Sequence, residues 1–335
     1  MKIRVQYILI MFVAMLIMLS PIISDAHVKW FTEVTPKKES IEQILTPLFM
    51  IMALSIAAFL AVLSQIWPSL DNIPFFQKLE GRLDGYRKYS RYILKYGTAV
   101  ALIVQASSGS IFAPELFITN TIVSILLWIT IGLLLIPVHY ATKVAALLLL
   151  GLFIYTTKEF GIFYMLDYGF YLAIIGVLLV GKTKLEDWGF PFLYLGTGLS
   201  LCWVAVEKWV YPVMSENIII NHQVPTFGFA PTTFIVMAAF IEFVVGYLLV
   251  VGILNRLLAF VLTLIFISTT MLFGTTEIIG HLMIHIVLII FIIEGVSFYD
   301  PPIRRHDTRI DQMIFVFLNF IFTLSTFILI YYRFA

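Results

Sequence analysis

Residues 278–290 read IIGHLMIHIVLII, and this stretch decides the class of fold. Such a dense run of apolar residues is typical of a helix buried in a lipid bilayer, yet it carries His281 and His285. The two histidines share one side of a helix, because residues four apart are neighbours on its surface. Glu277 extends this stripe by a further turn. The stretch therefore predicts a membrane-spanning helix with a polar stripe that faces other helices.

The composition of the whole chain agrees with a membrane environment. Of the 335 residues, 61% are hydrophobic and 12% are charged, with a mean hydropathy of +1.00. These values lie outside the usual range of soluble domains. The formal net charge of +1 gives no reason to expect a nucleic-acid partner. The chain has a single cysteine, Cys202, which argues against dithiol redox chemistry by this chain alone.

The first 26 residues have the features of a signal peptide. Lys2 and Arg4 precede an apolar stretch, and the sequence Ser24-Asp25-Ala26 offers small residues to a signal peptidase. We expect cleavage after Ala26. Residues 27–43 would then form an extracytoplasmic segment.

The apolar runs predict an all-α, polytopic membrane protein with about ten transmembrane helices. The predicted spans are 44–67, 92–112, 117–138, 141–157, 161–180, 190–209, 231–254, 257–273, 278–298 and 312–332. The first span and a basic cytoplasmic loop make up residues 44–91, and the final membrane helix occupies residues 312–333. With residue 27 outside, most basic residues fall in cytoplasmic loops. We therefore expect a protein of a bacterial-type inner membrane with both mature termini extracytoplasmic.

An internal repeat organises the middle of the chain. Residues 92–182 and 190–299 share landmarks in the same order, such as Gly97-Thr98 with Gly196-Thr197. Each copy has four predicted helices, so both have the same orientation and form two parallel four-helix bundle repeats. The first copy is degenerate, because it has Tyr168 where the second has His281.

Five ionisable residues of the second unit are candidates for a functional site: Glu207, Lys208, Glu242, His281 and His285. The rise of about 1.5 Å per residue places all five in the same half of one unit. Such groups are costly at membrane depth and often mark function. The residues leave three chemistries open: metal ligation, proton exchange with a quinone head group, and a proton path. Hydrogen bonding that only holds the helices together is the structural alternative.

The quinone hypothesis gives each candidate residue a role. Glu242 and His285 act as the catalytic pair that exchanges protons, and His281 orients the bound head group. Glu207 and Lys208 complete the binding site by gating it or neutralising charge. The chain has no nucleotide-binding glycine motif and no haem-attachment motif, so any redox centre other than a quinone would belong to a partner protein. The identity of a bound metal stays unassigned.

The second unit resembles the DoxX/DoxD family of small four-helix membrane proteins. The resemblance lies in GTGLSLCWVAVEKW at 196–209, FIEFVVGYLLVVG at 240–252 and the basic turn NR at 255–256. It covers about residues 190–299, where Lys208, Glu242 and Arg256 would occupy the family's polar positions. The resemblance implies a membrane subunit linked to quinone-dependent oxidation, as in the thiosulfate:quinone oxidoreductases. A non-enzymatic role is the alternative, either as a permease for a metal or small solute or as a membrane assembly factor.

Overall fold

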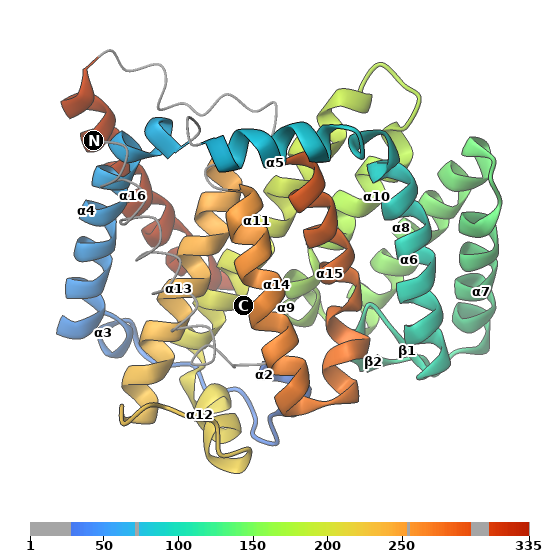
Figure 1. The fold of residues 1–335 in the computed structure, drawn as a ribbon. Helices are drawn as coiled ribbons and strands as arrows, with labels where there is room; N and C mark the ends of the chain where they lie inside the picture. The colour runs from blue at the N-terminus through green and yellow to red at the C-terminus, as the bar shows by residue number, and fades with distance from the viewer. Residues whose placement is uncertain (1–27, 71–73, 253–254, 296–307, 335) are drawn as a thin grey trace.

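The computed structural model describes residues 28–70, 74–252, 255–295 and 308–334, so the predicted signal peptide lies outside the described residues. Long helices make up most of the described chain (Figure 1). The helices that coincide with predicted spans are α4 (Pro47–Leu70), α6 (Ser90–Ser107), α7 (Thr121–Leu135), α8 (His139–Phe160), α10 (Phe170–Val180), α11 (Gly189–Val210), α13 (Pro231–Val251), α14 (Asn255–Phe273), α15 (Thr275–Glu294) and α16 (Arg309–Phe334). The shorter helical elements are α2 (Val28–Phe31), α3 (Ile41–Ile44), α5 (Pro74–Asp84), η2 (Arg87–Tyr89), α9 (Ile162–Met165), η3 (Leu166–Tyr168), η4 (Glu186–Trp188) and α12 (Pro212–Asn221).

The prediction of an all-α polytopic membrane protein is confirmed. Within the described ranges, 6 helices are long and apolar enough to cross a bilayer, and there are up to 7 spans if the bent pair around Gly169 counts as one. Helices α7 and α14 are apolar but shorter. The strands β1 (Ser110–Ile111) and β2 (Ala113–Phe117) form a small antiparallel hairpin between α6 and α7.

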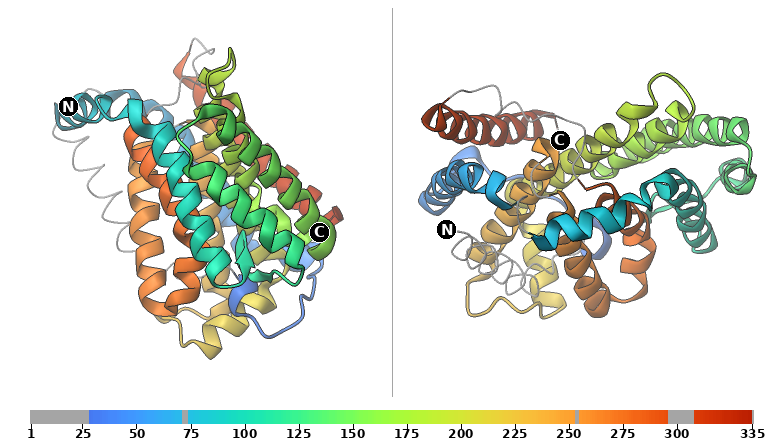
Figure 2. Two further views of the ribbon diagram at one scale, coloured as in Figure 1. Left: turned by 90° about the vertical axis from the view of Figure 1, so that its right-hand side faces the viewer. Right: turned by 45° about the horizontal axis from the view of Figure 1, so that its top comes forward.

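The helices run between two ends of the bundle (Figures 1 and 2). Helix α5 lies across the helix termini at one end, which we call the α5 end. Helices α2 and α12 and the hairpin lie at the other, the α2 end (Figure 1). Helices α4 and α16 pack together at one edge of the molecule, whereas α7 lies at the opposite edge (Figure 1).

Two helix contacts, α10 with α11 and α6 with α15, agree with the predicted repeat. In that repeat α6 corresponds to α11, and α10 corresponds to α15. Helix α11 packs against α10, and α6 packs against α15, so the two contacts are equivalent under the proposed pairing. The duplication itself stays a prediction.

Helices α11 and α13 meet through two glycines. A Cβ atom at Gly198 would lie 2.6 Å from the carbonyl oxygen of Gly246, and one at Gly246 would lie 2.7 Å from that of Gly198. Small residues allow this close approach of two helices in a membrane, where dispersion contacts replace the hydrophobic effect as the main attraction. The two glycines thus fix the positions of the polar residues that follow on α11 and precede on α13.

Replacing Gly198 with valine should force α11 away from α13. We expect the free energy of unfolding to fall by about 1–3 kcal/mol, the usual range for overpacking. Thermal unfolding of the purified protein in detergent measures the change. Gly151→Val on α8 is the matched control, because no atom lies within 4 Å of a Cβ built there. Equal unfolding temperatures for the two variants would contradict the role of this contact.

The predicted span at 161–180 is bent rather than continuous. Helices α9 and η3 on one side of Gly169 and α10 on the other differ in direction by 57°. At the break, the backbone N–H of Phe170 donates to Ser200 Oγ at 2.9 Å rather than to a carbonyl of the preceding turn. The bend turns Asp167 and Tyr168 toward α2, where both take part in polar contacts.

A buried glutamine holds the hairpin in place. The backbone N–H of Phe112 donates to Gln105 Oε1 at 3.0 Å, and Gln105 Nε2 donates to the Tyr171 hydroxyl at 2.9 Å. Phe112 has a φ of 65°, which is strained for a residue with a side chain. These bonds support the tight turn and bring Glu115 of β2 against η3.

Candidate functional site

Lys29 is the centre of a buried ion network at the α2 end. Helix α2 places its ammonium 2.7 Å from Asp167 Oδ2 and 2.7 Å from Glu207 Oε2. The ammonium also donates to the carbonyl of Phe163 at 2.8 Å and lies 3.9 Å from the centre of that ring. The charged side chains are 1% exposed. One cation thus joins three elements that are far apart in the sequence.

The charges around Lys29 favour its protonated form. Burial alone would lower the pKa of Lys29, but the carboxylates of Asp167 and Glu207 outweigh burial and raise it above its usual value. Tyr331 of α16 supports the same cluster by donating to Glu207 Oε2 at 3.0 Å. Because one lysine faces two acids, removal of its charge would leave buried carboxylates without compensation.

A second chain of hydrogen bonds leads from Trp30 to the hairpin. Trp30 Nε1 donates to the Tyr168 hydroxyl at 2.7 Å, and that hydroxyl donates to Glu115 Oε1. The other oxygen of Glu115 is buried and has no hydrogen-bond partner within the described residues. Burial raises the pKa of Glu115 to about 7, although the bond from Tyr168 opposes the shift.

Glu207 and Lys208 are consecutive, yet they serve different clusters. Whereas Glu207 faces Lys29, the ammonium of Lys208 lies 2.7 Å from Glu242 Oε2 on α13. The Lys208 side chain is 1% exposed and that of Glu242 is 15% exposed. The pair connects α11 to α13 about three turns from the glycine contact along α11 and about one turn from it along α13.

His281 is held by an acid and by two aromatic rings. Its Nδ1 hydrogen-bonds to Glu277 Oε2, which also accepts from the Thr269 hydroxyl at 2.8 Å. The imidazole stacks on Phe266 with ring centres 4.4 Å apart, and Trp30 lies 4.8 Å away on a tilted plane. Gly280 leaves room for this indole, since a Cβ there would collide with it.

A small polar cavity lies between these groups. It has a volume of about 40 Å³ and is lined by the side chains of Asp167, Tyr168, Thr197, Ser200, Glu242 and His281, together with apolar residues. This volume suits a few water molecules, each of which needs roughly 10–15 Å³ by this measure. It is far below the roughly 150 Å³ of a cavity that holds benzene. The cavity therefore suits the exchange of protons rather than the binding of a ring.

Residues 197–275 match the family model described as DoxX. We call residues 197–275 the DoxX domain, after the family model that they match. The match confirms the family resemblance inferred from the sequence and supports a multi-pass membrane protein. No curated protein and no solved structure matches the chain.

The DoxX domain supplies only part of the polar cluster. Glu207, Lys208 and Glu242 lie within the matched residues, whereas Lys29, Asp167 and His281 lie outside them. The cavity is thus formed where the DoxX domain meets η3, the start of α10 and α15.

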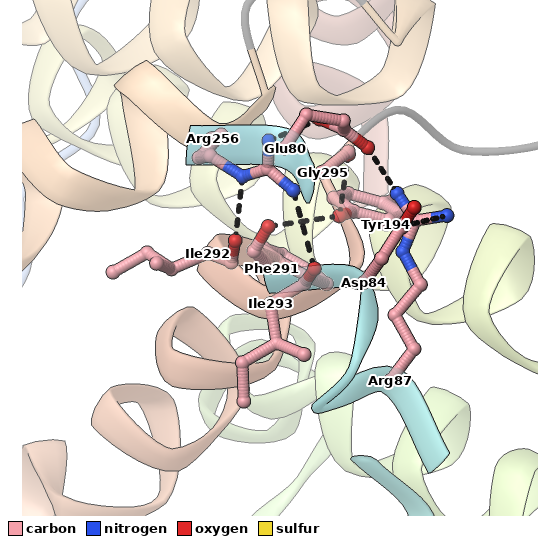
Figure 3. Close-up of polar contacts among 9 residues, drawn as sticks. All are labelled: Glu80, Asp84, Arg87, Tyr194, Arg256, Phe291, Ile292, Ile293 and Gly295. Carbon is pink, nitrogen blue, oxygen red and sulfur yellow. Dashed lines mark hydrogen bonds and ion pairs between the residues drawn. The ribbon is translucent and has the colours of Figure 1, made fainter. Parts of the chain in front are cut away.

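Arg256 of the DoxX domain connects helices at the α5 end (Figure 3). Its guanidinium donates to the carbonyls of Ile292 at 2.6 Å and Ile293 at 3.2 Å, so it caps the end of α15. It also pairs with Glu80 of α5, which pairs in turn with Arg87 (Figure 3). The arrangement indicates that Arg256 fastens α5 to α15, at the end of the bundle opposite to α2.

The structure brings together some of the five predicted site residues and separates others. Glu242 and His281 line the same cavity, and Lys208 is paired with Glu242. His285 is half-buried and lies edge-on to Phe266, with ring centres 6.0 Å apart, so it is outside the cavity lining. Glu207 is committed to the network around Lys29.

Sequence reasoning missed the residues that complete the cluster. The sequence places Lys29 in an outer segment, and neither Asp167 nor Glu115 is among the predicted site residues.

Within the described residues, no group of three or more His, Cys, Asp or Glu side chains has an arrangement suited to a metal ion.

Glu115 should make the stability of the protein depend on pH. Its folded-state pKa of about 7 exceeds that of an unfolded glutamate, about 4.3, so folding favours the protonated form. This contribution is complete below about pH 4.3 and is lost as the pH rises through 7. Glu115→Gln should remove the difference in unfolding temperature that Glu115 causes between pH 5 and pH 8. Glu159→Gln, at an exposed position, is the control; identical pH profiles for wild type and Glu115→Gln would contradict the assignment.

Proposed function

We propose that this chain is the membrane subunit of a quinone-linked oxidoreductase, in which a quinone binds at the edge of the DoxX domain and a buried site exchanges its protons. The proposal rests mainly on one observation: α11 contributes residues both to an apolar groove of the size of a small-molecule site and to the polar cavity. The family resemblance supports the same class of reaction.

The groove follows α10, α11 and α13 toward the α5 end. It has a volume of about 430 Å³, within the usual range of small-molecule sites, and its lining is mainly apolar. Trp188, Phe192 and Leu195 line it and are 68%, 45% and 39% exposed, so the groove opens on the surface that faces lipid. A lipid-soluble ring could enter it directly from the membrane.

Helix α11 connects the groove to the cavity. Leu195 lines the groove and Thr197 lines the cavity, and residues two apart on a helix point to different sides of it, so α11 lies between the two sites. The Thr197 hydroxyl is buried and has no hydrogen-bond partner within the described residues. This hydroxyl is therefore available to a proton path within the cavity, which Glu242 and His281 also line.

The chemistry requires protons from the chain and electrons from elsewhere. Reduction of a quinone to a quinol takes two electrons and two protons, and the reverse reaction releases them. Glu242 and His281 would exchange the protons, while His285, one turn further along α15, would extend the path. The electrons would come from a partner, since the only cysteine is buried and the sequence lacks cofactor motifs.

The distribution of basic residues supports an orientation for the proposed enzyme. Arg87, Lys182 and Arg256 belong to segments at the α5 end. By the positive-inside bias, that end would face the cytoplasm of a bacterial-type inner membrane. The ion network around Lys29 would then lie near the extracytoplasmic side.

Quinone binding to groove variants tests the proposal. We would purify the full chain in detergent, measure quinone in its lipid extract, and titrate it with a short-chain ubiquinone. Leu195→Trp should fill the groove and reduce both bound quinone and affinity at least roughly tenfold, because a ring that cannot enter loses its apolar contacts. Leu172→Trp on α10 is the control, because it is 40% exposed but lies outside the groove.

The alternatives give different results in the same preparation. A metal or solute permease or an assembly factor predicts no saturable quinone binding by the wild-type protein. Binding that Leu195→Trp and Leu172→Trp weaken equally would also contradict a site in the groove.

A further inference from the structure

A basic pocket at the α5 end shares no lining residue with the groove or the polar cavity. It has a volume of about 270 Å³ and is formed by the start of α6, the connection from α7 to α8 and the end of α10. Four basic side chains line it: Lys88, Arg91, Lys95 and Lys182. None of them lines the groove or the polar cavity, so their substitution tests a site other than the proposed quinone site.

The pocket keeps most of its positive charge. Its lining includes one acidic residue, Glu186, whose carboxylate lies 2.7 Å from Arg91 Nε. Within the described part of the chain, no carboxylate lies within ion-pairing distance of the ammonium of Lys88, Lys95 or Lys182. Three cations around one hollow therefore lack protein counter-charges.

Lys95 is the buried cation of this pocket. The residue is 7% exposed, and its ammonium donates to the carbonyl of Ile136 at 2.6 Å. An ammonium has three donors, and a buried one without a counter-charge is costly. The side chain lines the pocket, where a bound anion would supply that charge.

The start of α8 adds backbone donors on another wall. His139 and Thr142 line the pocket, and the N-cap residue Val138 provides no side-chain cap. The first N–H groups of a helix lack partners within it, and the helix dipole favours negative charge there. Cationic side chains and a helix N-terminus thus converge on one hollow.

The position and remaining lining of the pocket favour a phosphate group. It lies where α7 and α10 end and α8 begins, at the level where lipid headgroups meet the helices of a membrane protein. Tyr92, Val177 and Leu178 add apolar surface beside the cations. We propose that this pocket binds a phosphate group, carried by an anionic phospholipid headgroup or present as free phosphate.

Binding by the full-length protein in detergent tests this proposal. The two probes are phosphatidylglycerol, compared with phosphatidylcholine of the same acyl chains, and inorganic phosphate, with dissociation constants from native mass spectrometry. The variant Lys95→Gln/Lys182→Gln should lose at least roughly tenfold in affinity, since each lysine makes a charge-assisted contact. The control Lys158→Gln/Lys184→Gln removes two charges at exposed positions outside the pocket and should bind as the wild type does.

The probes also distinguish the two sources of phosphate. Tighter binding of phosphatidylglycerol than of phosphatidylcholine, lost only in the pocket variant, supports a lipid site. Saturable binding of inorganic phosphate that is lost in the same variant, without preference for the anionic lipid, supports a free-phosphate site. No saturable binding of either probe, or equal losses in the pocket and control variants, would overturn the proposal. Unfolding temperatures of both variants verify that they fold.

Discussion

Replacing Lys29 with methionine should lower the free energy of unfolding by about 3–5 kcal/mol, the cost of breaking a buried ion pair from one side. Methionine fills a similar volume but leaves Asp167 and Glu207 as two buried carboxylates without their shared cation. The loss should also release α2 from α9 and α11, because the contact with the Phe163 carbonyl disappears as well. Chemical unfolding in detergent measures the change.

Two further variants separate the role of this charge from a general effect of losing a lysine. Lys37→Met removes an exposed ammonium from the same segment and should have little effect. Combining Lys29→Met with Asp167→Asn and Glu207→Gln should recover much of the lost stability, because no buried charge is then left without compensation. If Lys29→Met were as stable as Lys37→Met, the network would not be a major support of the fold.

The membrane helices could be predicted because their signal is local. A continuous apolar run indicates a span whatever surrounds it, and each predicted span coincides with a helix. The break at Gly169 was missed because it depends on a partner: Ser200 on another helix receives the backbone donor that the bend releases. A bend made by tertiary contacts leaves little trace in an apolar sequence.

The polar cluster could be predicted only in part, for a similar reason. Glu242 and His281 stand out because ionisable residues are rare within apolar runs. Lys29 does not, since it follows the predicted signal segment, in a polar stretch where lysine is ordinary. Its aromatic neighbours Trp30 and Phe31 were the available signal, because such residues next to a lysine favour a buried or interfacial position.

The separation of Glu207 from Lys208 could have been predicted from helix geometry. Successive residues on a helix point about 100° apart, so neighbours in sequence do not face each other. The structure follows this rule: Glu207 faces Lys29 and Tyr331, whereas Lys208 faces Glu242. Adjacent Glu and Lys residues near a helix end, such as Glu207 and Lys208, thus indicate contacts with two different clusters rather than an ion pair with each other.

Replacing Glu242 with glutamine should reduce quinone turnover about 100-fold or more, the usual contribution of a group that transfers protons. Glutamine keeps the shape and can still accept a hydrogen bond from Lys208, but it cannot take up and release a proton at the cavity. Quinone binding should stay near the wild-type value, because the groove proposed to hold the ring is unchanged. Stopped-flow reduction by the natural electron donor, or by a chemical reductant, measures turnover.

A double variant distinguishes the loss of proton exchange from the loss of structure. Glu242→Gln alone removes the carboxylate that pairs with Lys208, which lowers stability as well as activity. Glu242→Gln combined with Lys208→Met removes both charges and should regain stability while turnover stays low. Recovery of turnover together with stability would mean that the pair only holds α11 to α13. If turnover stays low in a stable double variant that still binds quinone, proton exchange is assigned to Glu242. In that case neither weaker quinone binding nor a weaker contact between α11 and α13 explains the low turnover.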